Sequence, residues 1–240
     1  MPTGPAARQA ISEAARSGAI RLVGQWEGCG PEEPWARPIG YPIANGLKLA
    51  EGWWAKGTEE GEIVVEPMDA FGSGLHPSTW LNAGALGQVI EAGLVAHQGW
   101  AVDLGSGSGV LSLVTAALSP VKVLAVDPAV EARRAIARNK ALNPSLASQI
   151  NFVQATHEVL GGPFILGTAN LPLPIMTEAL PALARALAVE AVAVLSGLRT
   201  QAQCWLEKTM QANGLEPIAW GKEAGWIVVV GKKVGRDGAI

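Results

Sequence analysis

Short runs of apolar residues recur along the chain from Trp100 onward. Five of them have the length and mainly apolar character that suit buried strands: Trp100–Leu104, Val121–Val126, Ile150–Val153, Phe164–Ala169 and Val192–Leu195. Stretches of helical length separate most of these runs or follow the last one: Val110–Leu118, Val130–Leu142, Ile175–Leu187 and Gln201–Asn213. This alternation predicts a mainly parallel sheet that is covered by helices on both faces.

The alternation stops near the C-terminus. Pro217–Trp220 and Trp226–Gly231 are apolar runs with only residues 221–225 between them, which is too short a link for a helix. We therefore expect them to pair as an antiparallel hairpin. The predicted fold class is α/β, with a seven-stranded, mostly parallel, Rossmann-like sheet, helices on both faces and a C-terminal antiparallel hairpin. This combination is typical of the class I methyltransferases that use S-adenosylmethionine.

The first 60 residues have a different pattern. A helix is predicted within residues 6–23, and a segment rich in Pro and Gly follows at 28–42. Residues 47–49 and 63–65 are predicted as short strands, and Trp80–Glu91 as a helix. We divide the chain into an N-terminal extension, residues 1–60, and a catalytic domain, residues 61–240. The extension either packs against the domain or caps a substrate.

The composition indicates a folded protein of moderate charge. Hydrophobic residues make up 49% and charged residues 16% of the chain, which excludes a disordered protein. The net charge of −3 argues against direct binding of nucleic acid. Two cysteines far apart in sequence and three histidines predict neither a disulfide framework nor a metal site. No continuous apolar span or signal sequence is recognisable, so we expect a cytoplasmic protein without membrane contact.

A glycine-rich loop follows the first strand of the alternating region. Asp103-Leu104-Gly105-Ser106-Gly107-Ser108-Gly109 joins this strand to a helix, and its glycines let the backbone turn tightly beside a ligand. The spacing differs from the G-x-G-x-x-G of dinucleotide-binding proteins, because Val110 stands where the last glycine would be. The charge of Asp103 is unfavourable beside a pyrophosphate but suits the ammonium group of S-adenosylmethionine. The alternative is a tight turn without a ligand.

Two polar residues follow later strands. Asp127 comes 22 positions after Gly105, close to the spacing of about 20 at which an acidic residue binds a ribose. Its carboxylate can accept hydrogen bonds from both ribose hydroxyl groups. Asn170 ends the fourth strand, where its side-chain oxygen can face an acceptor amine. Ligands of open parallel sheets bind beyond the carboxyl ends of the strands, so we expect both residues at one site rather than in unrelated turns.

The most specific motif lies upstream of these strands. Ala70-Phe71-Gly72-Ser73-Gly74-Leu75-His76-Pro77-Ser78-Thr79 closely resembles the A-F-G-T-G-x-H-x-T-T signature of the bacterial ribosomal-protein methyltransferases of the PrmA family. The resemblance extends from about residue 47 to residue 232. Asn170-Leu171-Pro172-Leu173 is similar to the Asn-Pro-Pro-aromatic motif of amino-group methyltransferases, although both leucines depart from it. The resemblance implies an S-adenosylmethionine-dependent enzyme that methylates amino groups of ribosomal protein L11.

The resemblance also implies roles for individual residues. Phe71, Gly72 and Thr79 are implied to line the cofactor pocket. Asp103, Gly105 and Gly107 are implied to contact the methionine part of the cofactor. Asp127 is implied to bind the ribose, and Asn170 to lie near the reacting methyl group. His76 is either a general base or a structural hydrogen-bonding residue. The family usually has a second acidic residue where this chain has Ala129, and an Asp where it has Ile165.

Which molecule accepts the methyl group is a separate question from which reaction is catalysed. In the family, an N-terminal α+β module docks the ribosomal protein, and the Pro- and Gly-rich start of this chain does not resemble that module. We expect a protein or peptide acceptor, with ribosomal protein L11 as the family candidate and another protein, peptide or small molecule as the alternative. The remaining candidate functions are a nicotinamide-dependent oxidoreductase, a non-catalytic binding module and a nucleic-acid methyltransferase, which the net charge and Leu173 disfavour. The glycine spacing and the terminal hairpin disfavour the oxidoreductase.

Overall fold

The computed structural model describes residues 41–42, 48–51, 62–66, 69–72 and 76–235. The helix expected within residues 6–23, and all of the predicted N-terminal extension except two short strands, lie outside these residues. The division at residue 60 therefore stays a prediction.

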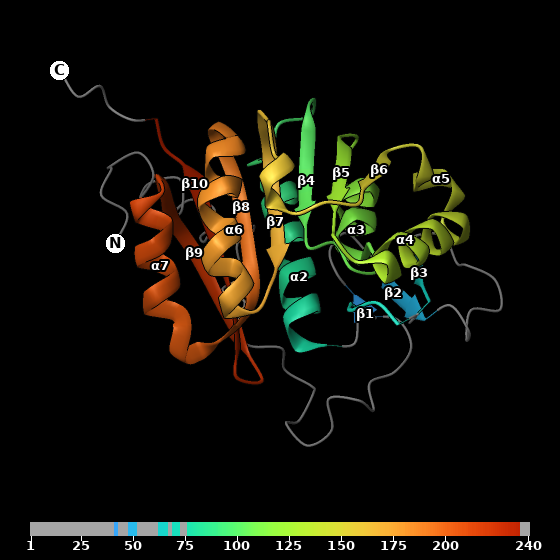
Figure 1. Cartoon of the computed structure of the whole chain (residues 1–240), viewed down its shortest axis with the longest axis horizontal. Coiled ribbons are helices and arrows are strands. Elements are labelled where there is room, and N and C mark those ends of the chain that lie inside the picture. The colour runs from blue at the N-terminus through green and yellow to red at the C-terminus, as the bar shows by residue number, and fades with distance from the viewer. Residues whose placement is uncertain (1–40, 43–47, 52–61, 67–68, 73–75, 236–240) are drawn as a thin grey trace.

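In the described part of the chain, seven strands form one large sheet (Figure 1). They are β4 (Trp100–Leu104), β5 (Lys122–Val126), β6 (Ile150–Val153), β7 (Phe164–Asn170), β8 (Leu187–Arg199), β9 (Leu215–Glu223) and β10 (Trp226–Lys233). Their order across the sheet is β6-β5-β4-β7-β8-β10-β9. The first five of these run parallel, β10 is antiparallel to β8, and β9 is antiparallel to β10. The predicted parallel sheet and terminal hairpin are confirmed.

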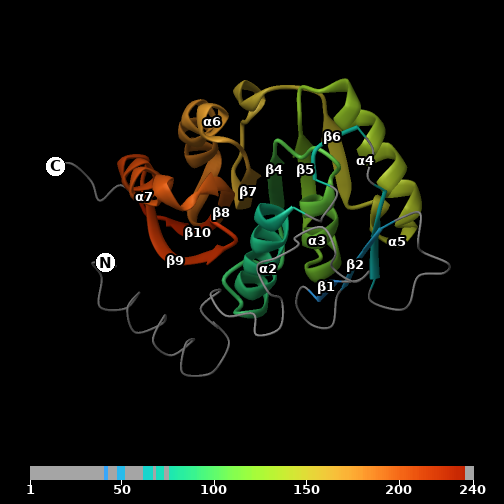
Figure 2. The same ribbon diagram turned by 90° about the horizontal axis from the view of Figure 1, so that it is seen from below.

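Helices cover both faces of this sheet. They are α2 (Pro77–Glu91), α3 (Val110–Leu118), α4 (Val130–Leu142), the short α5 (Pro144–Ala147), α6 (Leu173–Ala186) and α7 (Gln203–Ala212), with 3-10 turns η1 (His157–Val159) and η2 (Thr200–Ala202). Figure 2 shows α2 and α3 on one face and α6 and α7 on the other. Among the described residues, no helix has the length and apolar character needed to cross a membrane.

The alternating side chains of β10 show how the sheet divides the core. Val228 and Val230 pack in one apolar cluster with residues of α2 and α3, whereas Ile227 and Val229 pack in a second cluster with residues of α6 and α7. All four are at most 5% exposed. A strand that is buried on both faces has no polar alternation, which is why these segments read as continuous apolar runs.

Several elements differ in extent from the prediction: β9, expected at Pro217–Trp220, runs from Leu215 to Glu223, and α2, expected at Trp80–Glu91, begins at Pro77. The strand expected at Val192–Leu195 runs from Leu187 to Arg199, with an irregular register near its start. The helix expected at Ile175–Leu187 begins two residues earlier and ends at Ala186. The helix expected at Gln201–Asn213 is split into η2 and α7. The hairpin turn is tight, because Ala224 and Gly225 both have positive φ, as a two-residue type I′ turn requires.

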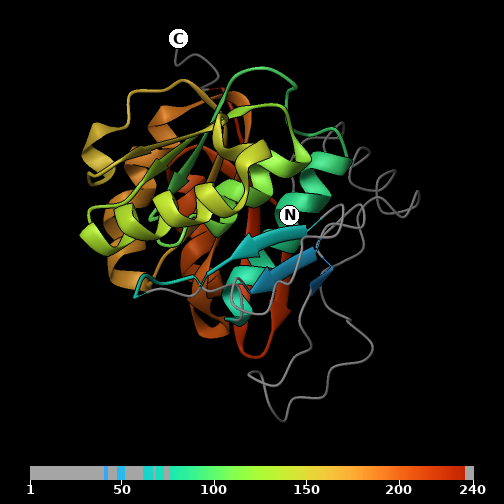
Figure 3. The same cartoon turned by 90° about the vertical axis from the view of Figure 1, so that its right-hand side faces the viewer.

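A small sheet of β1 (Tyr41–Pro42), β2 (Lys48–Glu51) and β3 (Glu62–Val65) lies beside α4 (Figure 3). The buried side chain of Asn143 accepts from the backbone N of Val64 at 3.0 Å and donates to its carbonyl oxygen at 2.7 Å. This amide thus occupies the hydrogen-bonding positions of a neighbouring strand. One turn earlier, Asn139 accepts from the backbone N of Glu66 at 2.9 Å and donates to the carbonyl oxygen of Ser108 at 2.9 Å. Asn139 therefore links the end of β3 to the glycine loop.

Candidate active site

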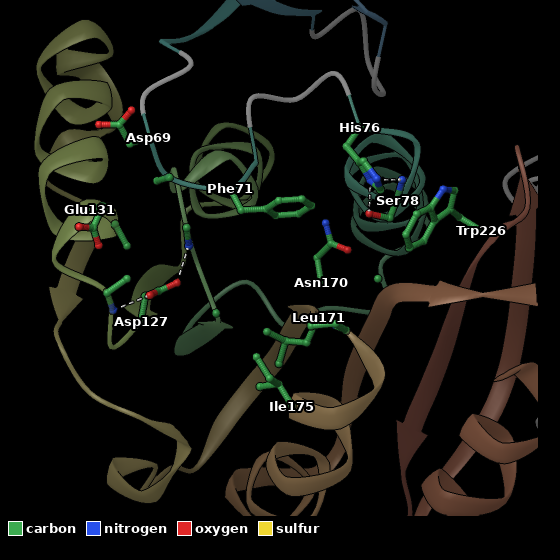
Figure 4. Close-up of a pocket in the computed structure, with 17 residues that line it drawn as sticks. Asp69, Phe71, His76, Ser78, Asp127, Glu131, Asn170, Leu171, Ile175 and Trp226 are labelled. Carbon is green, nitrogen blue, oxygen red and sulfur yellow. Dashed lines mark hydrogen bonds between the residues drawn. The ribbon is translucent and has the colours of Figure 1, made fainter. Parts of the chain in front are cut away.

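A cavity of about 590 Å³ opens at the carboxyl ends of β4, β5, β7 and β8. Its wall is formed by Asp69, Ala70, Phe71, His76, Ser78, Gly105, Gly107, Asp127, Ala129, Glu131, Ala132, Asn170, Leu171, Pro172, Ile175, Gly197 and Trp226. Figure 4 shows Asp69, Asp127 and Glu131 on one side, Asn170, His76 and Trp226 on the other, and Phe71 between them. The cavity therefore has an acidic end and an end with an amide and two aromatic rings.

The cavity brings together most of the residues singled out from the sequence. Phe71, His76, Gly105, Gly107, Asp127 and Asn170 lie on its wall. Gly72, Thr79 and Asp103 do not: Gly72 is bonded to Ser108 of the glycine loop, Thr79 to Asn170 of the wall, and Asp103 to Ser112 of α3. Gly72 and Thr79, for which the resemblance implies lining of the cofactor pocket, are thus not on the wall of this cavity, and their contact with a cofactor stays a prediction.

The glycine loop is held against the segment that carries Phe71. The backbone N of Ser108 donates to the carbonyl oxygen of Phe71 at 2.9 Å, and the Ser108 hydroxyl donates to the carbonyl oxygen of Gly72. A Cβ atom at Gly107 would overlap the carbonyl oxygen of Phe71, and the positive φ of Gly107 is unfavourable for other residues. Only glycine fits here, so two segments 36 residues apart in sequence form one rigid wall.

Asp103 lies beneath this loop and is 1% exposed. The hydroxyl of Ser112 donates to its Oδ2 at 2.6 Å, whereas its buried Oδ1 has no hydrogen-bond partner among the described residues. Burial raises the pKa of this carboxyl group to about 7; the hydrogen bonds from Ser112 oppose the rise, and the nearby charge of Asp127 adds to it. A cationic group reaching the loop would stabilise the carboxylate.

Asp127 is fixed by two backbone donors. Its Oδ2 accepts from the backbone N of Gly107, and its Oδ1 accepts from the backbone N of Ala129, both at 2.9 Å. Each carboxylate oxygen keeps a further lone pair, and the side chain faces the cavity (Figure 4). Ala129 is the N-cap residue of α4 and supplies no capping side chain. Two hydroxyl groups on adjacent carbons match the two oxygens of Asp127.

Asn170 stands at the opposite end of the cavity. It ends β7, is 9% exposed, and donates from Nδ2 to the hydroxyl oxygen of Thr79 at 3.2 Å. Its Oδ1 is buried and has no partner in the described part of the chain. An unpaired buried acceptor is unfavourable in the free protein and is satisfied when a donor binds.

His76 is the N-cap residue of α2. Its Nδ1 accepts from the backbone N of Ser78 at 3.3 Å and lies 2.8 Å from the Ser78 hydroxyl oxygen. Burial, and to a lesser degree the charge of Arg199, lower the pKa of the imidazole, so the ring is neutral near pH 7. A backbone N–H can only donate, so in the neutral ring the hydrogen is on Nε2. His76 therefore lacks a free lone pair for a proton from the cavity.

Aromatic and cationic side chains surround this histidine. The rings of Phe71 and Trp226 meet His76 edge to face, with centroid distances of 5.4 Å and 4.5 Å. The guanidinium group of Arg199 lies 4.0 Å from the centroid of the Trp226 ring. The wall at this end is thus formed largely by packed aromatic rings and lies close to one positive charge.

Several wall residues were not identified from the sequence. Ser78, Leu171 and Ile175 adjoin predicted site residues along the chain, and their positions next to the signature and next to Asn170 were the available signal. Trp226 comes from the terminal hairpin, 56 residues after Asn170, and no sequence spacing places it there. In the described part of the chain, no group of three or more His, Cys, Asp or Glu side chains is arranged to hold a metal ion.

The fold and this site together define a class. A sheet of order β6-β5-β4-β7-β8-β10-β9, in which only β10 is reversed, with a glycine loop after β4 and an acidic residue after β5, is the class I methyltransferase fold. A solved structure of a ribosomal protein L11 methylase from Lactobacillus delbrueckii subsp. bulgaricus shares it, with a TM-score of 0.71 and 23% identity over 82% of this chain and 100% of that one.

The model of the ribosomal protein L11 methyltransferase (PrmA) family matches residues 40–234, and the chain belongs to this family. A ribosomal protein L11 methyltransferase from Synechococcus sp. (strain RCC307) is 29% identical over 95% of this chain and 78% of its own length. One from Thermus thermophilus is 30% identical over 86% of this chain and 80% of its own length. The predicted class I fold and the predicted family are thereby confirmed.

Proposed function

We propose that the chain is an S-adenosylmethionine-dependent methyltransferase that methylates amino groups of a protein, with ribosomal protein L11 as the first acceptor to test. The observation that carries this proposal is the cavity itself, which joins an acidic, glycine-lined end to an end with an unpaired amide oxygen. The names of the relatives support the choice of acceptor.

The residues present fit the cofactor. Three buried oxygen atoms at or beneath the cavity have no partner in the described part of the chain, namely Asp103 Oδ1, Ser106 Oγ and Asn170 Oδ1. Asp103 would take the ammonium group of the cofactor, and the free lone pairs of Asp127 would accept hydrogen bonds from its ribose hydroxyl groups. Phe71, which is 60% exposed, presents its ring at the cavity for contact with apolar parts of the cofactor. Gly72 and Thr79 are bonded to the glycine loop and to the wall, respectively.

The chemistry requires positioning more than acid or base catalysis. When bound, S-adenosylmethionine supplies a methyl group that is already activated by its sulfonium centre. The chain's part is to hold the acceptor nitrogen in line with this methyl group and to exclude water. The apolar wall of Leu171, Ile175 and Trp226, with Arg199 nearby, lowers the pKa of an entering amine and so favours its neutral form.

Asn170 and His76 then have different tasks. The Oδ1 atom of Asn170 accepts a hydrogen bond from the amine N–H and so directs the nitrogen lone pair. His76 caps α2 and packs between two aromatic rings, and we assign it a positioning role instead of that of a base. The proton released by the amine leaves to solvent.

The decisive experiment uses S-adenosylmethionine labelled in its methyl group. The purified chain is incubated with ribosomal protein L11 in one reaction and with a bacterial lysate in another. Label on L11 supports the proposed acceptor. Label only on other lysate components means that the same chemistry serves another acceptor, and no label in either reaction contradicts the proposed activity.

Two variants test the assigned residues. Asp127→Ala is expected to weaken binding of S-adenosylhomocysteine while the fold is retained, and an unchanged affinity would show that the ribose lies elsewhere. Asn170→Ala is expected to abolish turnover with nearly unchanged binding of S-adenosylhomocysteine. Persistent turnover would reduce Asn170 to a turn residue. Calorimetric titration and the labelled transfer assay separate the two outcomes.

A further inference from the structure

We propose that Arg199 is a specificity residue that binds a carboxylate carried by the acceptor near its target amine. This inference rests on the proposed function and names the class of acceptor that the site takes. Arg199 ends β8 and is exposed, and its guanidinium group lies 4.0 Å from the centroid of the Trp226 ring. Trp226 is on the cavity wall, at the end that contains Asn170 (Figure 4). The positive charge is therefore held beside the acceptor end of the cavity.

The terminal hairpin fixes the place of this arginine. Arg199 and Trp226 are directly opposite each other in the antiparallel pair of β8 and β10, which brings their side chains to the same face of the sheet. Next to this pair, the backbone N of Thr200 donates to the carbonyl oxygen of Gly225 at 3.0 Å. A Cβ atom at Gly225 would lie 3.5 Å from Nη1 of Arg199, so the guanidinium group lies close to the turn as well as to the ring. A guanidinium group that stacks on an aromatic ring keeps the N–H groups of its edge available, and two of these match the two oxygens of a carboxylate.

Arg199 forms no ion pair with a carboxylate in the part of the chain that the structure describes. Arg138, by contrast, is paired with Glu66, and Lys232 with Glu190. Figure 4 shows the acidic residues of the cavity wall at the opposite end, namely Asp69, Asp127 and Glu131. The charge of Arg199 is therefore not neutralised by the described residues.

This charge acts on the acceptor end of the cavity. Burial is the larger cause of the lowered pKa of His76, and the charge of Arg199 lowers it further. The imidazole ring meets the ring of Trp226 at a centroid distance of 4.5 Å. A positive charge here disfavours the entry of a protonated amine, which has no lone pair to attack a methyl group. A carboxylate on the acceptor would pair with Arg199 and offset this repulsion, so acceptors with an acidic group near the amine are favoured over those with neutral or basic neighbours.

The first test measures the binding of peptides to the complex of the chain with S-adenosylhomocysteine by calorimetric titration. Each peptide contains a single lysine and a single Glu placed up to about four positions before or after it, and the matched peptide has Gln in place of Glu. At least one Glu position should lower the Kd roughly three- to tenfold relative to its Gln counterpart, the size of an ion pair at a partly exposed site. In Arg199→Gln this ratio should fall below about 1.5. A ratio that survives in Arg199→Gln would overturn the proposal.

The matched control is Lys222→Gln. Lys222 is also an exposed cation over a tryptophan of the same hairpin, 4.8 Å from the centroid of the Trp220 ring, but neither residue is on the cavity wall. This variant should keep the wild-type preference for Glu, and a loss of the preference would show that the charge of the hairpin acts without a site at Arg199.

Two further readouts test the site itself. Arg199→Glu should reverse the preference, so that peptides with a second lysine at the selected position bind more tightly than their Gln counterparts. A retained preference for Glu in this variant would contradict the proposal. The Kd of S-adenosylhomocysteine should stay within about twofold in Arg199→Gln, and a larger loss would mean that Arg199 binds the cofactor instead of the acceptor.

Free lysine distinguishes two sources of the carboxylate. Tighter binding of L-lysine than of lysinamide, lost in Arg199→Gln, would support a main-chain carboxylate, whereas a preference confined to the Glu peptides would support an acidic side chain. Equal binding in both comparisons, or no binding at all, would overturn the role of Arg199. These measurements need no turnover. Transfer of labelled methyl groups to L11 or to lysate components decides the proposed function separately.

Discussion

The buried carboxyl group of Asp103 makes the stability of the protein depend on pH. Burial raises its pKa to about 7 from an ordinary value of 3.8. Between these two values the folded chain keeps a proton that the unfolded chain has lost. The stabilisation of the folded chain by the protonated Asp103 carboxyl group is therefore complete below pH 3.8 and is lost as the pH rises through 7. For this shift, the free energy of unfolding falls by about 2 kcal/mol between about pH 5.5 and pH 8.

Asp103→Asn isolates this contribution, because an amide of the same shape does not titrate. In a chain of this length, about 2 kcal/mol corresponds to a change in Tm of about 4–8 °C. The difference in Tm between wild type and Asp103→Asn should therefore shift by this amount across the pH range, in favour of the wild type at low pH. Asp69→Asn, which removes an exposed carboxylate of the cavity wall, is the control and should follow the wild-type curve. Parallel curves for wild type and Asp103→Asn would refute the argument.

Ligand binding tests the same group independently. S-adenosylhomocysteine carries an ammonium group, and its approach to Asp103 favours the ionised carboxylate. The Kd should then fall about tenfold between about pH 6 and pH 7.5, with the release of a proton, and Asp103→Asn should abolish this dependence. In Ser112→Ala the pKa of Asp103 should rise further, because a hydrogen bond to the carboxylate is lost, and the midpoint should move to higher pH. A Kd that is independent of pH would place the ammonium group elsewhere.

Three further substitutions test the loop conformation, the hydrogen bonds and the helix cap that surround the site. Gly107→Ala places a Cβ against the Phe71 carbonyl oxygen at a positive φ, and should weaken S-adenosylhomocysteine binding by about 1–3 kcal/mol in calorimetric titration. Asn139→Ala leaves the Glu66 N–H and the Ser108 carbonyl group unpaired, and should lower the free energy of urea unfolding by about 2–3 kcal/mol. Ala129→Ser supplies the missing N-cap side chain of α4 and should raise that free energy by about 1 kcal/mol, whereas Ala129→Val, which offers no capping oxygen, should not.

Much of the large sheet could be predicted from short, mainly apolar runs bounded by turn residues. β4 and β6 begin and end as predicted, although β4 contains Asp103 and, of β6, only Ile150 is buried. The first half of β8 was missed because Val189 and Glu190 are exposed and Glu190 has a positive φ, which does not fit the pattern of a buried strand. The start of α6 was missed because two prolines suggested a turn, although proline is also typical of the first turn of a helix.

The sequence predicts site residues only where a functional side chain directly follows or ends a strand. Asp127 and Asn170 stand at strand ends, and the parallel topology alone brings such residues to one edge. Asn139 and Asn143 are different, because they bond to β3 and its flank across 73 and 79 positions of sequence. In the sequence, Asn139 reads as an ordinary polar position of α4 and Asn143 as its C-terminal cap, and only the folded chain shows that both are buried and satisfied by backbone groups.

The segment that carries the family signature connects the two ends of the cavity. Its first part, at Phe71 and Gly72, is bonded to the glycine loop, and its last part, at Thr79, is bonded to Asn170. The two ends of the cavity therefore depend on one stretch of chain but on separate hydrogen bonds. Loss of the bonds between Ser108 and the segment at Phe71 and Gly72 should weaken cofactor binding and leave the bond between Thr79 and Asn170 in place.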